Sequence, residues 1–403
     1  MAAALLWLAG CLAPGLAGSA RRSIAPDPAH APYPPSPLLS GLDWHWETYR
    51  HAAHGSDLWP VTWADDNHLY AAWGDGGGFG GSDADGRVAM GIARIEGGPE
   101  HYRGVNVNGG KAPEHPASFL RAGKTAGLVC VDGTLYATIN LQDGPWPNVN
   151  HALAWSTDHG ATWTRADWLF PAGAGSFQPA TFLQFGRDYA GVPALLAGYV
   201  YLYGARQPGT PAPRSEARRR AAAAPDSTVT TADPPVAIEP DEAPQHLYLV
   251  RIPRDQLRRR AAYEFWAGFG AKGRARWTGV WTRAQPVFTD PNGVASGHVV
   301  YDPVLKTFLL TTFHVGPGQL GVFHAPHPWG PWRTVAYYSQ WAGLGAAGEG
   351  LSCEFPQKWM SADGLTLGCV FSVYGPGAKQ GIYAHDRFNL VQVSLTPIRP
   401  RAR

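Results

Sequence analysis

The chain has 403 residues, of which 16% are charged and 12% are aromatic, and it contains 17 tryptophans, 49 glycines and 36 prolines. So many helix breakers exclude a coiled coil or a helical bundle, and they favour short strands joined by tight turns. The 33 basic and 31 acidic side chains leave a net charge of only +2, which gives no electrostatic case for binding nucleic acid or an anionic membrane.

The N-terminal residues 1–20 form a short apolar segment that ends in small residues, which is the pattern of a secretion signal peptide. Glycine and proline break this segment, and no stretch of the chain is long and apolar enough to span a bilayer. We therefore expect a secreted or cell-surface protein. Leu8 to Cys11 resembles a lipoprotein box, so lipid anchoring at Cys11 stays open as an alternative.

Proline-rich residues 21–38 predict an extended spacer before the main domain, which we place at residues 39–398. Five times this domain repeats one pattern: a short apolar strand, a turn rich in Asp, Gly or Asn, and a second apolar strand. The five hairpins span residues 58–73, 126–138, 180–203, 298–313 and 355–371. A third apolar strand follows each hairpin, at residues 88–95, 152–156, 247–252, 320–324 and 390–395.

These repeats predict an all-β fold, namely a five-bladed β-propeller. One hairpin cannot bury both of its faces, whereas five sheets arranged around an axis can. A sandwich of two sheets is the alternative. Within the third repeat, residues 205–244 combine an Arg-rich run with a segment that lacks aromatic residues, so we expect a disordered insertion there.

Two local patterns have structural interpretations. The motif S-x-D-x-G-x-T-W, from Ser156 to Trp163, predicts a turn in which Asp158 accepts amide hydrogens, Gly160 takes a positive φ and Trp163 inserts between sheets. The cysteines of the domain lack the spacing of a zinc site or a disulfide framework, and we expect buried thiols at Cys130, Cys353 and Cys369.

The hairpin pattern also sorts the acidic residues of the first repeat. In a propeller, the start of each innermost strand and the end of its returning partner meet at one rim, and the turn lies at the opposite rim. Asp57 starts the first strand and Asp75 follows the end of its return, so we expect the two carboxylates to oppose each other. Two close carboxylates repel, which raises one pKa and gives the acid and the base that a glycosidase needs. Asp65 lies in the turn, so Asp65 and Asp83 form a weaker pair of the same spacing.

Further polar residues are expected around the mouth of the axis, where they would bind substrate. They are Lys124, Gln178, His298 and Glu354 at strand starts and His314 at a strand end. Glu354 is also a candidate acid. Trp146, Trp59 and Trp73 can stack on sugar rings, although the core between blades is the more common place for Trp59 and Trp73. We expect no cofactor, and a structural divalent cation on the axis is compatible with the sequence without a ligand cluster that demonstrates one.

Several segments, among them DLWPVTWADDNHLYAAWGDG, GKTAGLVCVDGTLYAT, AWSTDHGATWT and FPQKWMSADG, resemble a secreted propeller family that long had no known function and that includes endo-D-arabinanases. The likeness covers about residues 42–395 apart from the insertion. The resemblance implies a five-bladed propeller. It also implies catalytic roles for Asp57 and Asp75, which match the two aspartates that such arabinanases use near the start of the domain.

We expect a glycoside hydrolase that acts on a polysaccharide such as arabinan, with Asp57 as base or nucleophile and Asp75 as acid. One alternative is a polysaccharide lyase on a uronate-containing glycan, in which His298, His314, Tyr374 and Lys124 supply the base, the acid and the cation. A glycan-binding propeller without catalysis is the other alternative. We expect a monomer whose partner is a polysaccharide.

Overall fold

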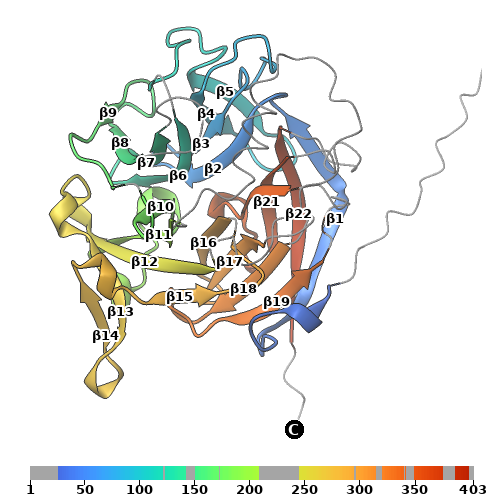
Figure 1. The fold of residues 1–403 in the computed structure, drawn as a ribbon. Coiled ribbons are helices and arrows are strands. Elements are labelled where there is room, and N and C mark those ends of the chain that lie inside the picture. The colour runs from blue at the N-terminus through green and yellow to red at the C-terminus, as the bar shows by residue number, and fades with distance from the viewer. Residues whose placement is uncertain are drawn as a thin grey trace, which may run out of the picture.

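The computed structural model describes residues 26–120, 123–141, 150–171, 173–207, 245–294, 296–314, 320–339, 341, 349–374 and 386–398. Across these residues the chain is almost entirely β, and five antiparallel sheets surround a common axis, which confirms the five-bladed propeller (Figure 1). The predicted signal peptide and residues 208–244 of the predicted insertion lie outside the described residues. Within them, no helix has the length and hydropathy that crossing a bilayer requires.

Blades one, two and four are meanders of four strands numbered outward from the axis, whereas in blade three β15 pairs with β12 beside the meander and in blade five β1 is the outermost strand. Blade one comprises β2 (Asp57–Trp63), β3 (Leu69–Gly74), β4 (Met90–Glu96) and β5 (Arg103–Asn108). Blade two comprises β6 (Lys124–Val131), β7 (Thr134–Leu141), β8 (Asn150–Ser156) and β9 (Thr164–Arg165). Blade three comprises β10 (Phe177–Phe182), β11 (Tyr199–Arg206), β12 (His246–Pro253), β13 (Glu264–Phe269), β14 (Ala275–Thr278) and β15 (Pro286–Thr289). Blade four comprises β16 (Ser296–Asp302), β17 (Thr307–Phe313), β18 (Leu320–Ala325) and β19 (Arg333–Tyr338).

The fifth blade joins the two ends of the domain. Its strands are β20 (Glu349–Glu354), β21 (Thr366–Tyr374), β22 (Phe388–Pro397) and the N-terminal strand β1 (Leu39–Ala52). β1 pairs antiparallel to β22, with Leu39 opposite Pro397 and Ala52 opposite Phe388. The remaining elements are short 3-10 turns: η1 (Pro28–His30), η2 (Arg187–Tyr189), η3 (Ala194–Leu196), η5 (Arg254–Gln256), η6 (Arg260–Ala262), η7 (Ala271–Gly273), η8 (Trp281–Arg283) and η9 (Gln357–Trp359).

Two sequence expectations about chain segments need correction. The first strand of the fifth hairpin is β20, not residues 355–360, which form η9 and its flanks. Pro356 has no N–H to give to a ladder, so the apolar side chains of this segment are buried without forming a strand. Residues 26–38 are not a detached spacer either. Asp27 N donates to Tyr337 O at 2.6 Å, and the Tyr33 ring packs 5.2 Å from that of Phe288, so this segment lies along blades three and four.

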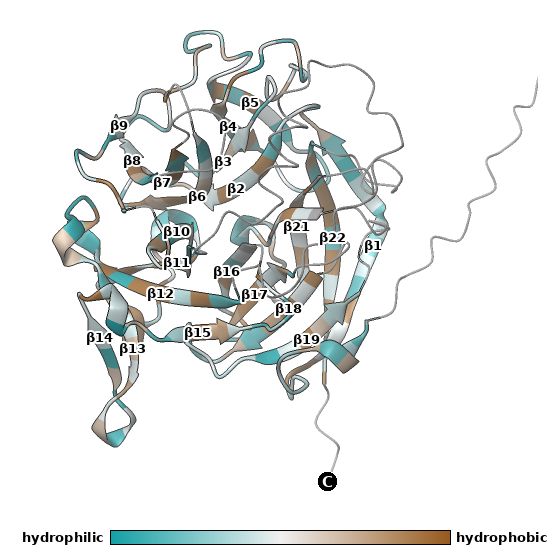
Figure 2. Cartoon of the chain, viewed as in Figure 1, coloured by the Kyte–Doolittle hydropathy of each residue, from teal (hydrophilic) through white to brown (hydrophobic). Residues whose placement is uncertain are grey.

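The core lies between the blades and is rich in aromatic side chains. Hydrophobic residues, brown in Figure 2, lie on the strands, while hydrophilic residues gather in the peripheral loops and on β1. Trp59 and Trp73 are fully buried and stack with ring centroids 5.8 Å apart, and Phe388 packs edge-on against Trp59 at 5.2 Å. These two tryptophans therefore belong to the core, and they offer no face to a sugar.

The predicted cysteine and turn features are also present. Cys130, Cys353 and Cys369 are free and buried, which confirms the thiol prediction. In the turn, Asp158 Oδ1 accepts the Thr162 N–H at 2.9 Å and Gly160 has a φ of +92°.

Hydroxyl groups link neighbouring blades close to the axis. Thr138 Oγ1 donates to Ala180 O at 2.5 Å, joining blades two and three. Thr181, Thr311 and Ser352 make the same kind of bond to a carbonyl of the next blade. Thr62 Oγ1 closes the circle by accepting Cys130 N–H at 2.9 Å. We call these five residues the hydroxyl ring, and its bonds connect each blade to the next.

Candidate active site

The structure brings several sequence-predicted residues together at one mouth of the axis. Asp57 opens β2 and is paired in the ladder with Gly74, the last residue of β3. Asp75 follows Gly74 directly, and Lys124 opens β6 of the neighbouring blade. Asp57 and Asp75 are both half-buried, whereas Lys124 is 9% exposed. The mouth thus combines two carboxylates with a cation that is largely removed from water.

Two cations bracket Asp75. Lys124 Nζ contacts Asp75 Oδ1 and also donates to Ala89 O at 3.0 Å. The Arg87 guanidinium lies 3.3 Å from the same Asp75 oxygen. Asp75 therefore forms ion pairs with two cations at the mouth, where the sequence predicted a proton donor.

A third carboxyl at the mouth, Asp386, was missed by sequence reasoning. Burial raises its pKa to about 8, and the negative charges of Asp57, Asp75 and Asp83 add to this rise. Its carbonyl accepts the Gly55 N–H at 2.8 Å, which ties it to the segment that leads into β2. Asp386 has the environment of a carboxyl that keeps its proton at neutral pH.

The strand order contains a signal that would have found Asp386. A third strand runs antiparallel to the second, so its start lies at the same rim as the end of the second strand. Asp386 stands just before β22, the third strand of blade five. The sequence rule considered first and second strands only.

Glycine is required where the two strands of blade one face the mouth. A Cβ added to Gly74 would lie 2.6 Å from Asp57 Oδ1 and 2.9 Å from Lys124 Cδ, both too close for a real contact. The backbone of Gly74 therefore sits directly against the Asp57 carboxylate. Gly76, one residue past Asp75, has a φ of +63° and turns the chain back beside Gly55.

His298 and Glu354 lie deeper in the axial channel than predicted. Glu354 ends β20 rather than starting its blade, because that strand lies earlier in the chain than expected. Its Oε1 is 2.7 Å from His298 Nδ1, and its Oε2 accepts the Val61 N–H at 3.1 Å. Both residues line a cavity of about 20 Å³, which is room for about one water molecule. Glu354 is thus a buried link between blades, and a direct substrate contact is not supported.

The remaining predicted binding residues have different outcomes. His314 does not face the mouth, because its side chain is fully covered and stacks on the Tyr337 ring at 4.1 Å. Burial lowers the His314 pKa to about 3, so it is a neutral core residue. Gln178 is half-buried near the start of β10, and Trp146 lies outside the described residues.

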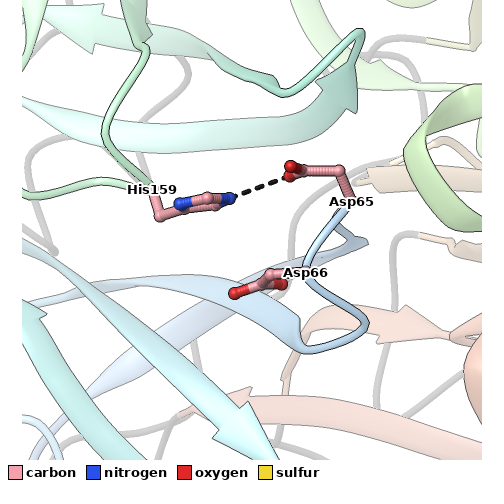
Figure 3. Close-up of side chains that lie close together, drawn as sticks. All are labelled: Asp65, Asp66 and His159. Atoms are coloured by element: carbon pink, nitrogen blue, oxygen red, sulfur yellow. Dashed lines mark hydrogen bonds and ion pairs between the residues drawn. The ribbon is translucent and has the colours of Figure 1, made fainter.

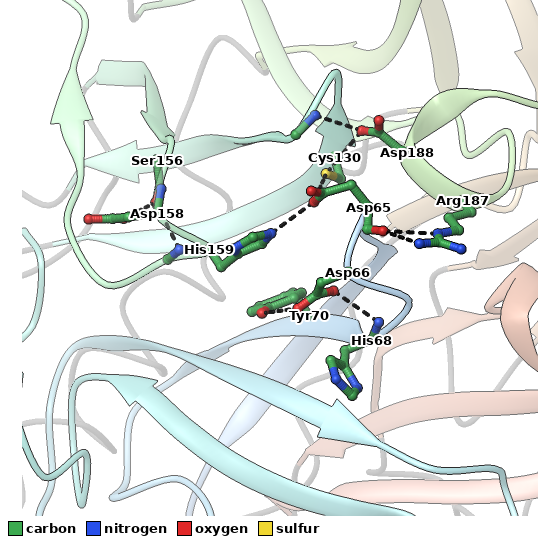
Figure 4. Close-up of polar contacts among 12 residues, drawn as sticks. Asp65, Asp66, His68, Tyr70, Cys130, Ser156, Asp158, His159, Arg187 and Asp188 are labelled. Carbon is green, nitrogen blue, oxygen red and sulfur yellow. Dashed lines mark hydrogen bonds and ion pairs between the residues drawn. The ribbon is translucent and has the colours of Figure 1, made fainter.

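A separate polar cluster lies at the opposite rim, in the turn between β2 and β3. His159 Nε2 is 2.8 Å from Asp65 Oδ1, and Asp66 lies beside this pair (Figure 3). One oxygen from each aspartate and one His159 nitrogen lie within 4.8 Å of one another, as metal ligands would. However, Asp66 already accepts His68 N–H at 3.0 Å and Tyr70 O–H at 2.7 Å (Figure 4). The bonds of Asp66 thus stay within the β2–β3 hairpin, and the contact between His159 and Asp65 joins the turns of blades one and two.

The weaker acid pair of the sequence analysis is therefore split between two rims. Asp65 sits in the cluster just described, where Arg187 also donates to its backbone carbonyl (Figure 4). Asp83 lies near the mouth and pairs with Arg87.

The sequence analysis left open a structural divalent cation on the axis. His298 and Glu354 could supply ligand atoms there, but they already contact each other. This set is poor in the oxygen ligands that Ca²⁺ prefers.

Comparison with known proteins gives likeness in fold alone. No family model matches the chain, and no curated protein matches it in sequence. The catalytic domain of the Coprinopsis cinerea GH62 alpha-L-arabinofuranosidase aligns with 89% of this chain and 98% of its own, at a TM-score of 0.43 and 11% identity. RS223-Beta-xylosidase aligns with 90% of this chain and 99% of its own, at a TM-score of 0.43 and 11% identity. A GH43_1 enzyme from Xanthomonas citri aligns with 88% and 92%, at a TM-score of 0.43 and 11% identity.

Proposed function

We propose that the protein is a glycoside hydrolase that cleaves a polysaccharide at the mouth formed by Asp57, Asp75 and Asp386. The observation that carries this proposal is the unequal environment of these carboxyls. Asp386 is half-buried with a raised pKa, whereas Asp75 is paired with Lys124 and Arg87. Hydrolysis of a glycosidic bond needs one carboxyl that is protonated and one that is ionised.

In this mechanism Asp386 protonates the leaving glycosidic oxygen. Asp57 acts as the base that activates water, or as the nucleophile that attacks the sugar. Asp75, which pairs with Lys124 and Arg87, places a negative charge that helps to keep the proton on Asp386 and that stabilises the positive charge developing on the sugar ring. This assignment moves the acid role from Asp75, where the sequence placed it, to Asp386.

A D-arabinan is the substrate that we propose first, because of the resemblance in the sequence around Asp57 and Asp75. Secretion through the N-terminal segment is part of the same proposal, since a polysaccharide of this kind lies outside the cell.

The test is incubation of the purified protein with arabinan, arabinogalactan and a uronate-rich glycan, with products analysed by mass spectrometry. Hydrolysis adds one water per bond broken, whereas a lyase yields an unsaturated product without added water. Asp57→Asn and Asp386→Asn should each abolish cleavage. Asp85→Asn is the matched control, because Asp85 is exposed on the same loop as Asp83 and pairs with Lys111 at 2.8 Å. Products without added water, or full activity of both variants, would contradict the proposal.

A further inference from the structure

The backbone next to Asp57 has an unusual conformation. Leu58 has a φ of +74° and Trp59 has a φ of +64°. Bulky residues rarely adopt this left-handed region, because the side chain then crowds the backbone. Among the described residues of the five innermost strands, only β2 holds non-glycine residues with positive φ. The β2–β3 register also slips between Leu58 and Val61. Asp75 and Asp386 at the mouth also have positive φ, at +55° and +46°, but among the innermost strands this conformation occurs only in the one that carries the proposed base.

Two serines of blade five hold both backbone polar groups of Leu58. The Leu58 N–H donates to Ser372 Oγ at 3.2 Å, and Ser352 Oγ donates to Leu58 O. Ser352 and Ser372 oppose each other directly in the β20–β21 ladder, and they are 2% and 0% exposed. A third bond, from Val61 N–H to Glu354 Oε2, fixes the far end of the same bulge.

This arrangement differs from the other seams of the hydroxyl ring. Thr181 and Thr311 each bind one carbonyl of the next blade. At the seam between blades five and one, Ser352 makes the ring bond to the Leu58 carbonyl, and Ser372 adds a second bond by accepting the Leu58 N–H. Strained conformations persist where the surroundings over-determine them, and such strain is concentrated at functional sites.

We propose that Ser352 and Ser372 are positioning residues that hold Leu58 in the left-handed conformation and thereby aim the Asp57 carboxylate into the mouth. The inference rests on the proposed function of Asp57. If either serine is lost, Leu58 relaxes toward negative φ, and the peptide that joins it to Asp57 turns with it. A carboxylate displaced by a fraction of an ångström loses its alignment with the reacting bond.

The test compares Ser372→Ala and Ser352→Ala with Thr311→Val, which removes one ring bond elsewhere and is the matched control. We expect both serine variants to lose at least tenfold in kcat, with a KM within about twofold of the wild-type value. The acidic limb of their pH–rate profile should also shift relative to wild type. Thr311→Val should lower Tm by about as much as each serine variant does, but it should leave kcat unchanged. Adding Leu58→Gly to Ser372→Ala should restore part of kcat, because glycine accepts positive φ without strain.

Serine variants with the kcat and pH profile of Thr311→Val would overturn the proposal, as would a double variant without rescue. If the wild-type protein cleaves no glycan, the proposed function fails, and the positioning role is then judged by crystal structures. The Ser352→Ala/Ser372→Ala variant should show Leu58 at negative φ and a displaced Asp57 carboxylate. An unchanged backbone in that variant would refute the positioning role by itself.

Discussion

Asp386→Asn should stabilise the fold at neutral and alkaline pH while it abolishes catalysis. Burial, followed by the charges of Asp57 and Asp75, raises the Asp386 pKa from 3.8 to about 8. The folded chain therefore holds this proton more tightly than the unfolded chain does. The associated stability is fully present below about pH 3.8, falls as pH rises, and is lost above about pH 8.

The expected magnitude follows from this interval. At pH 7 the pKa in the unfolded chain lies about 3 units below the pH, and each unit corresponds to about 1.36 kcal/mol. Ionisation linked to Asp386 therefore lowers the free energy of unfolding by up to about 4 kcal/mol at pH 7. Asparagine cannot ionise, so the variant avoids this loss. Urea denaturation should show a gain of several kcal/mol at pH 7.5 and a gain within about 1 kcal/mol at pH 4.5.

Asp158→Asn provides a control of opposite sign. Burial tends to raise the Asp158 pKa, but hydrogen bonds from Ser156 and Thr162 outweigh it, so the net shift is downward. This variant should be less stable than wild type at pH 7.5. The reasoning about Asp386 fails if Asp386→Asn is no more stable than wild type at pH 7.5, or if the gain is equal at both pH values.

Gly74→Ala should lower kcat about 100-fold in the glycan assay, because the new Cβ would push against Asp57 Oδ1 and Lys124. A kcat within twofold of wild type would count against the close approach of the Gly74 backbone to the Asp57 carboxylate. Trp59→Ala should lower the free energy of unfolding by about 3–5 kcal/mol in urea, and a loss below 1 kcal/mol would mean that the core around it collapses freely. Burial lowers the His314 pKa to about 3, so the stability of the wild-type protein should fall as pH drops from 6.5 toward 3. In thermal scans, His314→Gln should reduce this dependence of Tm on pH. An identical dependence in both proteins would contradict the prediction.

Much of the fold was predictable, because hairpins are local in sequence. The alternation from residue 58 to 73 and its central turn define β2 and β3 without any tertiary information. The first strand of blade five was placed wrongly, because β20 contains two glutamates and a glycine while the apolar residues around Trp359 lie in a connection. Burial of that connection by other blades is a tertiary effect that periodicity does not report.

The site was predictable only where it depends on one hairpin. Asp57 and Asp75 come together through the β2–β3 register, and Lys124 follows from the start of the next blade. Asp386 is 311 residues from Asp75, and it reaches the mouth only because the ring closes. His314 could not be placed, because whether a residue at a strand end faces a channel or the core depends on packing against Tyr337.

The closure of blade five by β1 has a consequence for synthesis. The ribosome makes Asp57 roughly 300 residues before Ser352, Ser372 and Asp386, so a nascent chain that lacks blade five cannot assemble the complete mouth. A chain that stops before β22 lacks both the proposed acid and the partner of β1. The proposed hydrolytic activity should therefore emerge only after β22 has been made and has paired with β1, and chains truncated before Asp386 should be inert.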